Sequence, residues 1–276
     1  ARYSLVDGLL QVEQFSTIGA SDTPGLFVQE GGTHDVGRLL RVAGGGRYTM
    51  VGGRIVAESA LNEGLFEVTN GRIDTSFENA GSFRWNGQGD VAGTGTITHL
   101  SSGSFEASAT GSFAPAVVNR GQWTKEGAGT QTYSGPITQN GSLLVNAGTM
   151  RLTGGATGEG NTSIATGAAM EFAGGASYTL SRQFNNNGQV LIDPAAATFS
   201  GSGLHTGRFD VDAGGDLTFA GISWTFNGTG SGIAGTGAMT FASGLTTFGQ
   251  GSAFTLTGPL QLTGGSVRFL AGSAMT

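Results

Sequence analysis

The chain has 276 residues, of which 52 are glycine and only 5 are proline, and its formal net charge is −6. Because 38% of the residues are hydrophobic and only 12% are charged, the composition excludes a disordered chain. The lack of a glycine at every third position excludes collagen, and scattered basic residues argue against a nucleic-acid surface. The absence of cysteine excludes a disulfide scaffold and a thiolate metal site.

Neither end of the chain shows a recognisable targeting segment. The first residues, ARYSLVDG, contain no basic stretch followed by an apolar one. No run of 18 apolar residues predicts a membrane-spanning helix. The last residues, RFLAGSAMT, stop within an alternating pattern. We therefore expect a processed or truncated piece of a longer protein, or a protomer of a longer assembly.

The first quarter of the chain contains imperfect internal repeats. RYSLVDGLLQ at 2–11 returns as RYTMVGGRIV at 47–56, and GLFVQEGG at 25–32 returns loosely as GLFEVTNG at 64–71. The best helical window, 53–68, fits strands broken at Asn62 and Gly64 equally well. Variable spacing between repeats is typical of stacked coils whose turns differ in length.

Alternation with a period of two dominates the second half of the chain. Single polar residues separate apolar pairs, and Gly, Asn, Ser or Pro separates one pair from the next. These pairs are Met170/Phe172, Val190/Ile192, Phe209/Val211, Leu217/Phe219, Trp224/Phe226, Met239/Phe241, Phe254/Leu256, Leu260/Leu262 and Val267/Phe269. Such runs predict short strands with one buried face.

Five Asn-Gly pairs favour turns in which both central residues have positive φ. The asparagines of these pairs are Asn70, Asn86, Asn140, Asn187 and Asn227.

Short and numerous strands fit a sandwich, a barrel or a solenoid. The visible repeats, the unchanging pattern and the absence of long loops favour the solenoid. We predict an all-β fold, a right-handed parallel β-helix (β-solenoid) of roughly 11–14 coils at roughly 20–25 residues per coil. It would run as a single continuous solenoid over residues 1–276.

One segment carries a more specific pattern. WTKEGAGTQTYSGPITQNGSLLVNAGTMRLTGG, at 123–155, resembles the autotransporter-associated β-strand repeat. The matching positions are Lys125, Gly127, Gly129, Thr130, Gly135, Val145, Asn146, Ala147, Gly148, Thr149, Arg151 and Leu152. Residues 25–33 and 48–53 resemble a related surface-protein repeat. The resemblance implies a right-handed β-helix on an exported bacterial surface protein and supplies no catalytic residue.

Residues that could carry chemistry are few. His34, His99 and His205 lie far apart in sequence; they are read as solvated turn or strand residues, with a metal or triad role left open. GSGIAG at 230–235 fits a nucleotide fingerprint, but a strand-like segment follows it where a helix is required.

Acidic residues leave one catalytic hypothesis open. Asp210 and Asp212 point to one face of a predicted strand, and Asp193, Asp216 or Glu171 on adjacent coils could complete a carboxylate cluster for polysaccharide cleavage. The alternative is an anionic, soluble surface.

Tryptophans and an asparagine run give two further readings. Trp85, Trp123 and Trp224 are either exposed sugar-stacking platforms or side chains that plug coil corners or core ends. Asn185, Asn186 and Asn187 predict a turn with an internal amide ladder, or a plain loop.

The two chain ends suggest self-association. An open coil presents unpaired backbone groups, and no capping helix is visible at either end. We predict head-to-tail stacking of subunits through terminal coils, carried by Tyr3, Leu5, Leu9, Leu262, Val267 and Phe269.

The expected role is an extracellular structural solenoid on the bacterial cell surface, as a filament subunit or a stalk. No catalytic residue, metal or cofactor is expected. The alternatives are an autotransporter-type adhesin passenger with a glycan or surface ligand, and a polysaccharide-acting β-helix enzyme. An exposed aromatic stripe would favour the adhesin. A cleft lined by three or more acids would favour the enzyme, and chain ends that pair with each other would favour the filament.

Overall fold

The computed structural model describes residues 1–275 and shows an all-β chain. Its strands pair in parallel, and residues 1–275 form no helix, so no helix in that range could cross a membrane. Stacked coils form a β-solenoid of about 14 turns, which confirms the predicted fold class. Contacts divide the chain into two compact units, Ala1–Ile137 and the part from Thr138 onward.

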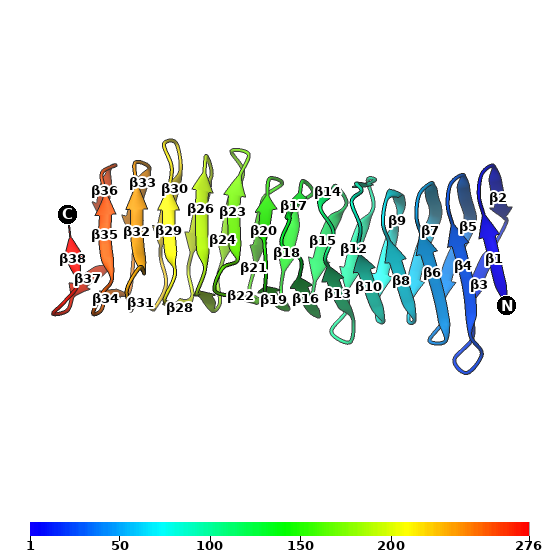
Figure 1. Cartoon of the computed structure of the whole chain (residues 1–276), viewed down its shortest axis with the longest axis horizontal. Helices are drawn as coiled ribbons and strands as arrows, with labels where there is room; N and C mark the ends of the chain where they lie inside the picture. The colour runs from blue at the N-terminus through cyan, green and yellow to red at the C-terminus, as the bar shows by residue number, and fades with distance from the viewer. Residues whose placement is uncertain (276) are drawn as a thin grey trace. The chain divides into compact units, whose positions relative to one another are not determined.

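Each full coil of the first unit has three sides (Figure 1). Side 1 is one parallel sheet of β1 (Arg2–Leu5), β4 (Gly25–Gln29), β6 (Gly46–Met50), β8 (Leu65–Val68), β10 (Ser82–Trp85), β13 (Ser104–Ala107) and β16 (Gln122–Lys125). Sides 2 and 3 contain β2 (Leu9–Val12), β3 (Phe15–Ile18), β5 (Thr33–Val42), β7 (Arg54–Asn62), β9 (Gly71–Asn79), β11 (Val91–Ala92), β12 (Thr96–His99), β14 (Gly111–Phe113), β15 (Ala116–Asn119) and β17 (Thr130–Tyr133).

Long strands distinguish the early coils. β5, β7 and β9 each run along sides 2 and 3, with a register shift where β5 pairs with β7 and β7 with β9. β9 then pairs with two separate short strands, β11 and β12. A bulge bends a strand without ending it, so these coils turn the corner between two sides inside one strand.

The second unit repeats the three-sided coil. Side 1 contains β19 (Ser142–Val145), β22 (Asn161–Ile164), β25 (Phe184–Asn186), β28 (Ser202–His205), β31 (Ser223–Phe226), β34 (Leu245–Phe248) and β37 (Ser266–Phe269). Side 2 contains β20 (Thr149–Leu152), β23 (Ala169–Ala173), β26 (Gln189–Asp193), β29 (Arg208–Val211), β32 (Gly232–Gly235), β35 (Ala253–Leu256) and β38 (Ala274–Met275). Side 3 contains β18 (Ile137–Gln139), β21 (Ala156–Gly158), β24 (Ser177–Leu180), β27 (Ala196–Phe199), β30 (Asp216–Phe219), β33 (Ala238–Phe241) and β36 (Leu260–Leu262).

Alternation places the predicted apolar pairs inside the coils. From Met170/Phe172 to Phe254/Leu256 every member of these pairs is buried, so the period-two prediction is confirmed there. Side chains two apart on a strand share one face, and in-register stacking lines them up in columns. The best-defined column of the first unit has ring centroids 5.0–5.2 Å apart and consists of Phe27, Tyr48, Phe66, Phe83, Phe105 and Trp123.

The Asn-Gly prediction is wrong in its geometry. No non-glycine residue in the described part of the chain has a positive φ, so none of the five asparagines occupies the left-handed region. Turns with two positive-φ residues join antiparallel hairpin strands, whereas these turns join sides of a parallel coil. Glycine alone supplies positive φ, for example Gly87 (94°) and Gly228 (101°) after Asn86 and Asn227.

Two ambiguous segments resolve as strands. Residues 53–68 form β7, which ends at Asn62 as predicted, and then β8. The GSGIAG segment contains β32, followed by β33, so it lacks the helix that a nucleotide fingerprint needs.

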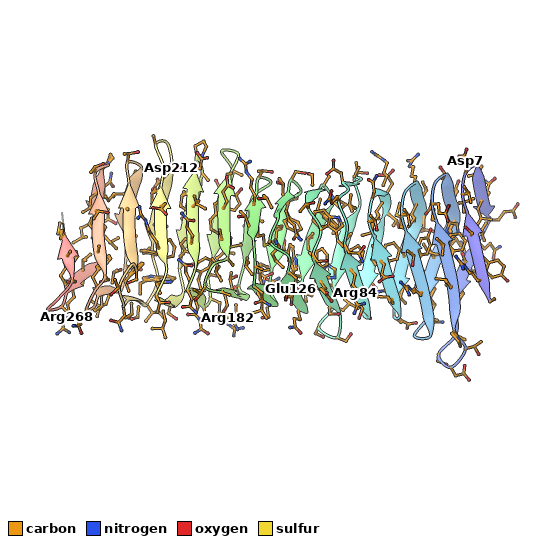
Figure 2. The ribbon with its side chains drawn as sticks, in the orientation of Figure 1. Asp7, Arg84, Glu126, Arg182, Asp212 and Arg268 are labelled. Carbon is orange, nitrogen blue, oxygen red and sulfur yellow. The ribbon has the colours of Figure 1, made fainter. Side chains whose placement is uncertain are left out.

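The outer faces of the two units differ. In the first unit, Glu67 contacts Arg47 and lies 4.0 Å from Arg84, and Arg84 lies 3.4 Å from Glu106 on the next coil; Figure 2 labels Arg84. Side 3 of the second unit instead carries an in-register column of uncharged hydroxyls, formed by Thr157, Thr179, Thr198, Thr218 and Thr240.

Candidate functional site

The three histidines are buried, so their reading as solvated residues is wrong. His34, His99 and His205 have exposed fractions of 0%, 0% and 1%, because each occupies an inward position of its strand. His34 shows how the core accepts a polar ring: its Nδ1 lies 3.1 Å from the Tyr48 hydroxyl, which donates to the Gln29 side chain at 2.7 Å. Burial lowers the pKa of His34 to about 4, against an opposing effect of Asp35.

His99 and His205 are equally unsuited to chemistry at neutral pH. Burial lowers the pKa of each to about 3, so both are neutral and enclosed. Within residues 1–275, no group of three or more His, Cys, Asp or Glu side chains is arranged to hold a metal ion.

A ladder of buried amides replaces apolar packing on side 3 of the first unit. Asn62 donates to Asn79 at 2.6 Å, and Asn79 lies 3.1 Å from Nδ1 of His99. Both amides also donate to backbone carbonyls on side 1, Asn62 to Ser82 at the start of β10 and Asn79 to Ser104 at the start of β13. Each amide therefore ties its own coil to the next.

Asn185 and Asn186 lie in the strand β25, where a turn or loop was predicted, and Asn187 lies in the bend that follows. Asn186, in β25, is fully buried and donates to the Arg208 carbonyl at 3.0 Å. Asn185 accepts from the Leu204 amide and Asn187 from the Thr206 hydroxyl, both at 3.0 Å. All three reach the following coil.

Lys125 of the repeat-like segment has a structural role that spacing did not reveal. Its side chain is buried, and Nζ donates to the carbonyls of Glu126 at 2.8 Å and Gly127 at 2.7 Å. Burial lowers the pKa of Lys125 to about 8, against an opposing effect of Glu126. A lysine suits this position because it satisfies turn carbonyls from inside the coil.

The proposed acidic cluster forms only in part. Glu171 on β23 lies within electrostatic reach of Asp193 and Asp212, while Arg151 lies 3.1 Å from it. Burial raises the pKa of Glu171, and Asp193 and Asp212 add to the rise against the effect of Arg151. Asp210 is paired with Arg208 on its own strand. Two of these acids, Glu171 and Asp210, are thus each paired with an arginine (Figure 2 labels Asp212).

The three tryptophans cannot act as sugar-stacking platforms. Trp85, Trp123 and Trp224 each have an exposed fraction of 0%. They fill the interior of their coils from the strands β10, β16 and β31, where plugs of coil corners or core ends were the expected alternative.

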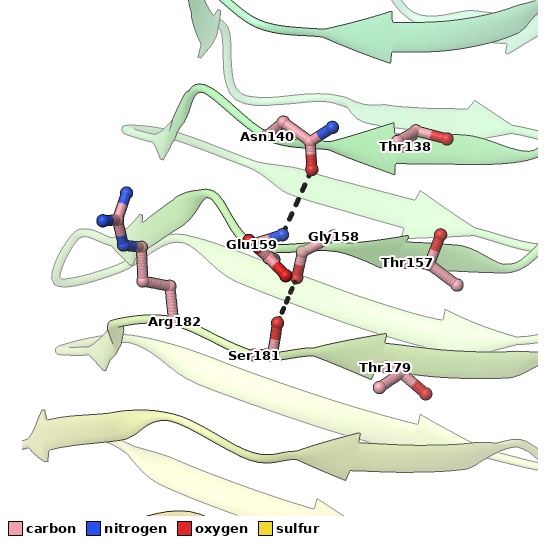
Figure 3. A pocket seen from close by; sticks show the side chains of 8 residues that line it. All are labelled: Thr138, Asn140, Thr157, Gly158, Glu159, Thr179, Ser181 and Arg182. Atoms are coloured by element: carbon pink, nitrogen blue, oxygen red, sulfur yellow. Dashed lines mark hydrogen bonds between the residues drawn. The ribbon is translucent and has the colours of Figure 1, made fainter.

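An open polar groove of about 670 Å³ lies on side 3 of the second unit (Figure 3). Its lining is Thr138, Asn140, Thr157, Gly158, Glu159, Thr179, Ser181 and Arg182. Asn140 accepts from the Glu159 amide at 3.2 Å, and Ser181 donates to the Gly158 carbonyl at 3.0 Å. Glycoside cleavage ordinarily uses two carboxyl groups, and this lining contains one, Glu159.

The first coil exposes side chains that belong to interior columns. Tyr3 pairs in register with Phe27, yet its exposed fraction is 66% against 6% for Phe27. Leu5 shares its inward face and is half-buried. On side 2 Leu10 pairs with the fully buried His34 and is also half-buried. This set of inward residues is open because β1 pairs only with β4 within the described chain.

The last described coil also exposes side chains that belong to interior columns. Phe269 stacks on Phe248 with ring centroids 4.9 Å apart, and its exposed fraction is 38% against 0% for Phe248. Leu262 is 59% exposed, although its partner Phe241 is buried. Val267 lies on the same inward face of β37 as Phe269.

Five of the six residues predicted for self-association therefore lie on inward columns that end at an open coil. Leu9 does not: it pairs with Thr33 on the outer face of side 2, and Leu10 takes its place inside. Met275, which is 63% exposed and pairs with buried Phe254, was missed. Strand parity would have found both residues, because inward positions alternate strictly.

Comparison with protein-family models, with curated proteins and with solved structures gives no match to this chain. The resemblance to the autotransporter-associated repeat stays a prediction.

Proposed function

We propose that this protein is an extracellular structural β-solenoid whose copies stack head to tail through their open coils. The observation that carries the proposal is the exposure of inward apolar side chains at both open coils, with Tyr3 at 66% and Met275 at 63%. In-register neighbours one coil away are at most 6% exposed. Apolar columns that end in water gain stability when another coil covers them.

The backbone supports the same proposal. β1 and β37 each have one sheet neighbour within the described residues, β4 and β34 respectively. Unpaired strand edges readily accept a further strand. A contact between two different surfaces of one chain is heterologous, and such contacts extend into filaments when they do not close.

The alternative functions have less support. An adhesin of the expected kind needs an exposed aromatic stripe, but the large exposed aromatic side chains in the described chain are Tyr3, Phe15 and Phe269, all on the terminal coils. A polysaccharide-acting enzyme needs a cleft lined by several acids, and the side-3 groove contains Glu159 alone.

Electron microscopy with sedimentation velocity over a dilution series tests the proposal. We expect fibres that persist on dilution. Phe269→Asp should raise the concentration required for assembly at least tenfold, because it places a charge on the contact. Ile222→Asp is the matched control: Ile222 is 80% exposed but lies in a turn outside the open coils, so assembly should be unchanged.

Single, non-associating particles at every concentration would contradict the proposal. Equal effects of Phe269→Asp and Ile222→Asp would also contradict it, since the open coils would then have no special role. The cell-surface part has a separate test: antibody should label intact source cells if the protein is exposed.

A further inference from the structure

Stacking could occur in several registers, and the exposed residues distinguish among them. We infer that β1 of one copy pairs in parallel with β37 of another, with Tyr3 opposite Val267 and Leu5 opposite Phe269. The inference rests on the proposed function and specifies the contact between two stacked copies, which we call the joint. It extends the register that already relates Tyr3 to Phe27 and Phe248 to Phe269 within one chain.

Parity excludes half of the registers. The inward residues are the second and fourth of both strands, Tyr3 and Leu5 on β1, Val267 and Phe269 on β37. A shift of one residue would place Arg2 and Ser4 against the core and turn the apolar side chains outward. Only even shifts keep the columns continuous.

Charge and coverage exclude the neighbouring even shifts. Moving β1 two residues one way sets Arg2 directly opposite Arg268, and like charges in that position are destabilising. Moving it two residues the other way leaves Phe269 without a partner. In the inferred register Arg2 faces Ser266 and Ser4 faces Arg268, so no like charges meet (Figure 2 labels Arg268).

Side 2 fits the same register. Ala274 and Met275 pair with Ala253 and Phe254 in their own chain, and Leu9 and Leu10 pair with Thr33 and His34 in theirs. Continuing both columns sets Met275 on Leu10 inside the coil and Ala274 beside Leu9 outside. Met275 is thereby covered by an apolar side chain. On side 3 the same register leaves β36 and β3 two strand spacings apart, so Leu262 is not covered by this joint.

Strand direction excludes a symmetric joint. A two-fold axis between copies would set β1 against β1 in antiparallel orientation. Coils of this chain pair in parallel throughout, and the edges of β1 and β37 continue that arrangement only when they meet each other. The joint is therefore head to tail.

Engineered cysteines test this register cleanly, because the chain has no cysteine of its own. Opposite residues on neighbouring strands lie about 4.8 Å apart, within the range that a disulfide spans. We expect Ser4→Cys with Arg268→Cys to form covalent multimers under oxidised glutathione. Two thiols lose two protons and two electrons, one disulfide forms between copies, and the oxidant becomes two reduced glutathione molecules.

The matched control is Ser4→Cys with Ser266→Cys. Its cysteines would lie about 8 Å apart in the inferred register, beyond the reach of a disulfide. Non-reducing gels should show at least a tenfold lower multimer yield than for the first pair. Ser4→Cys alone should give no dimer, since a dimer would require the symmetric joint.

Electron microscopy of the reduced samples separates the two possible failures. Fibres with equal or reversed cross-linking yields, or with dimers of Ser4→Cys alone, would overturn the inferred register and leave the proposed function standing. Absence of both fibres and cross-links would overturn the proposed function, and the register with it.

Discussion

The two units of this solenoid share an interior plan but differ on the outside. Nine of the 13 basic and 13 of the 19 acidic residues lie in the first unit. That unit carries a run of cross-coil ion pairs on side 1, such as Arg84–Glu106. The second unit has a cross-coil pair on side 2, Arg151–Glu171, and on side 3 carries the uncharged threonine column that begins at Thr157. Inside, both are filled by aromatic columns and by buried polar groups such as Asn79 and Asn186.

The comparison indicates which part of a coil determines the fold. Inward positions are restricted to side chains that pack or bond to the neighbouring coil, because each coil buries its core only against the next. Outward positions need only suit a pleated, wet surface, which both charge pairs and threonines do. The following predictions test this separation, from the largest expected effect to the smallest.

Acid should open the first unit further than the second. The folded pKa values of about 4, 3 and 3 lie below the unfolded value of 6.5, so stability is complete above pH 6.5 and is lost as pH falls toward the folded values. At pH 4.5 each histidine costs about 2–3 kcal/mol. The first unit contains two of them and the second one. Hydrogen exchange resolved by peptide measures both.

His205→Gln is the control for this effect. It should remove the histidine part of acid sensitivity from the second unit and leave the first unchanged. Equal opening of both units in the unsubstituted protein would show that the buried histidines do not set the acid response.

Replacing an aromatic residue of an interior column by alanine should lower the free energy of unfolding by the same amount in both units. Phe66 contacts Tyr48 and Phe83, and Phe219 contacts Trp224 and Phe241, with ring centroids 4.8–6.2 Å apart. Phe66→Ala and Phe219→Ala should each lower the free energy of unfolding by about 3–5 kcal/mol. Urea titration would contradict the shared interior if one loss were under half the other.

Removal of one amide from the buried ladder should have an intermediate effect. Asn79→Ala removes the partner of His99 Nδ1 and the donor to the Ser104 carbonyl, and leaves Asn62 with its bond to the Ser82 carbonyl alone. Each unsatisfied group costs about 1–3 kcal/mol. We expect a loss of about 2–4 kcal/mol in urea titration. Ser102→Ala, on an exposed turn, is the control and should be nearly neutral; an equally neutral Asn79→Ala would mean that water satisfies the ladder.

Substitutions on the outer faces should have the smallest effects on stability. The salt dependence of these effects should differ between the two units. Glu67→Gln removes the charge that Arg47 and Arg84 share; Glu67 itself is buried, but both arginines are about half-exposed. The loss should be about 1 kcal/mol and should decrease with added salt. Thr218→Ser in the second unit should be small at every salt concentration. A salt-dependent effect of Thr218→Ser would contradict the uncharged character of the threonine column on side 3.

The sequence predicted the elements of this fold well, because strand parity is a local property. Pairs such as Met239/Phe241 indicate both a strand and its buried face. The local alternation of apolar and polar residues could not predict which polar residues are buried at inward positions. His99 and Asn186 look like surface residues until the neighbouring coil supplies their partners. Leu9 and Leu10 are adjacent leucines, so the pairing of β2 with β5 is needed to show that Leu10 is the inward one.

The sequence alone could indicate which terminal residues are apolar but not how far they are exposed, because exposure depends on which strands have neighbours. The candidate residues Tyr3 and Phe269 follow from the alternating pattern. Their partners one coil away, Phe27 and Phe248, lie far along the chain. The register of the inferred joint needed the three-dimensional pairing of both ends.

Burial of all three tryptophans gives each unit its own optical reporter. Trp224 is the only tryptophan from Thr138 onward, and Trp85 and Trp123 both lie before that point. Indole emission moves to longer wavelength when water reaches the ring. A chain carrying Trp85→Phe and Trp123→Phe would therefore fluoresce from the second unit alone, and one carrying Trp224→Phe from the first alone, so the opening of each can be followed by colour.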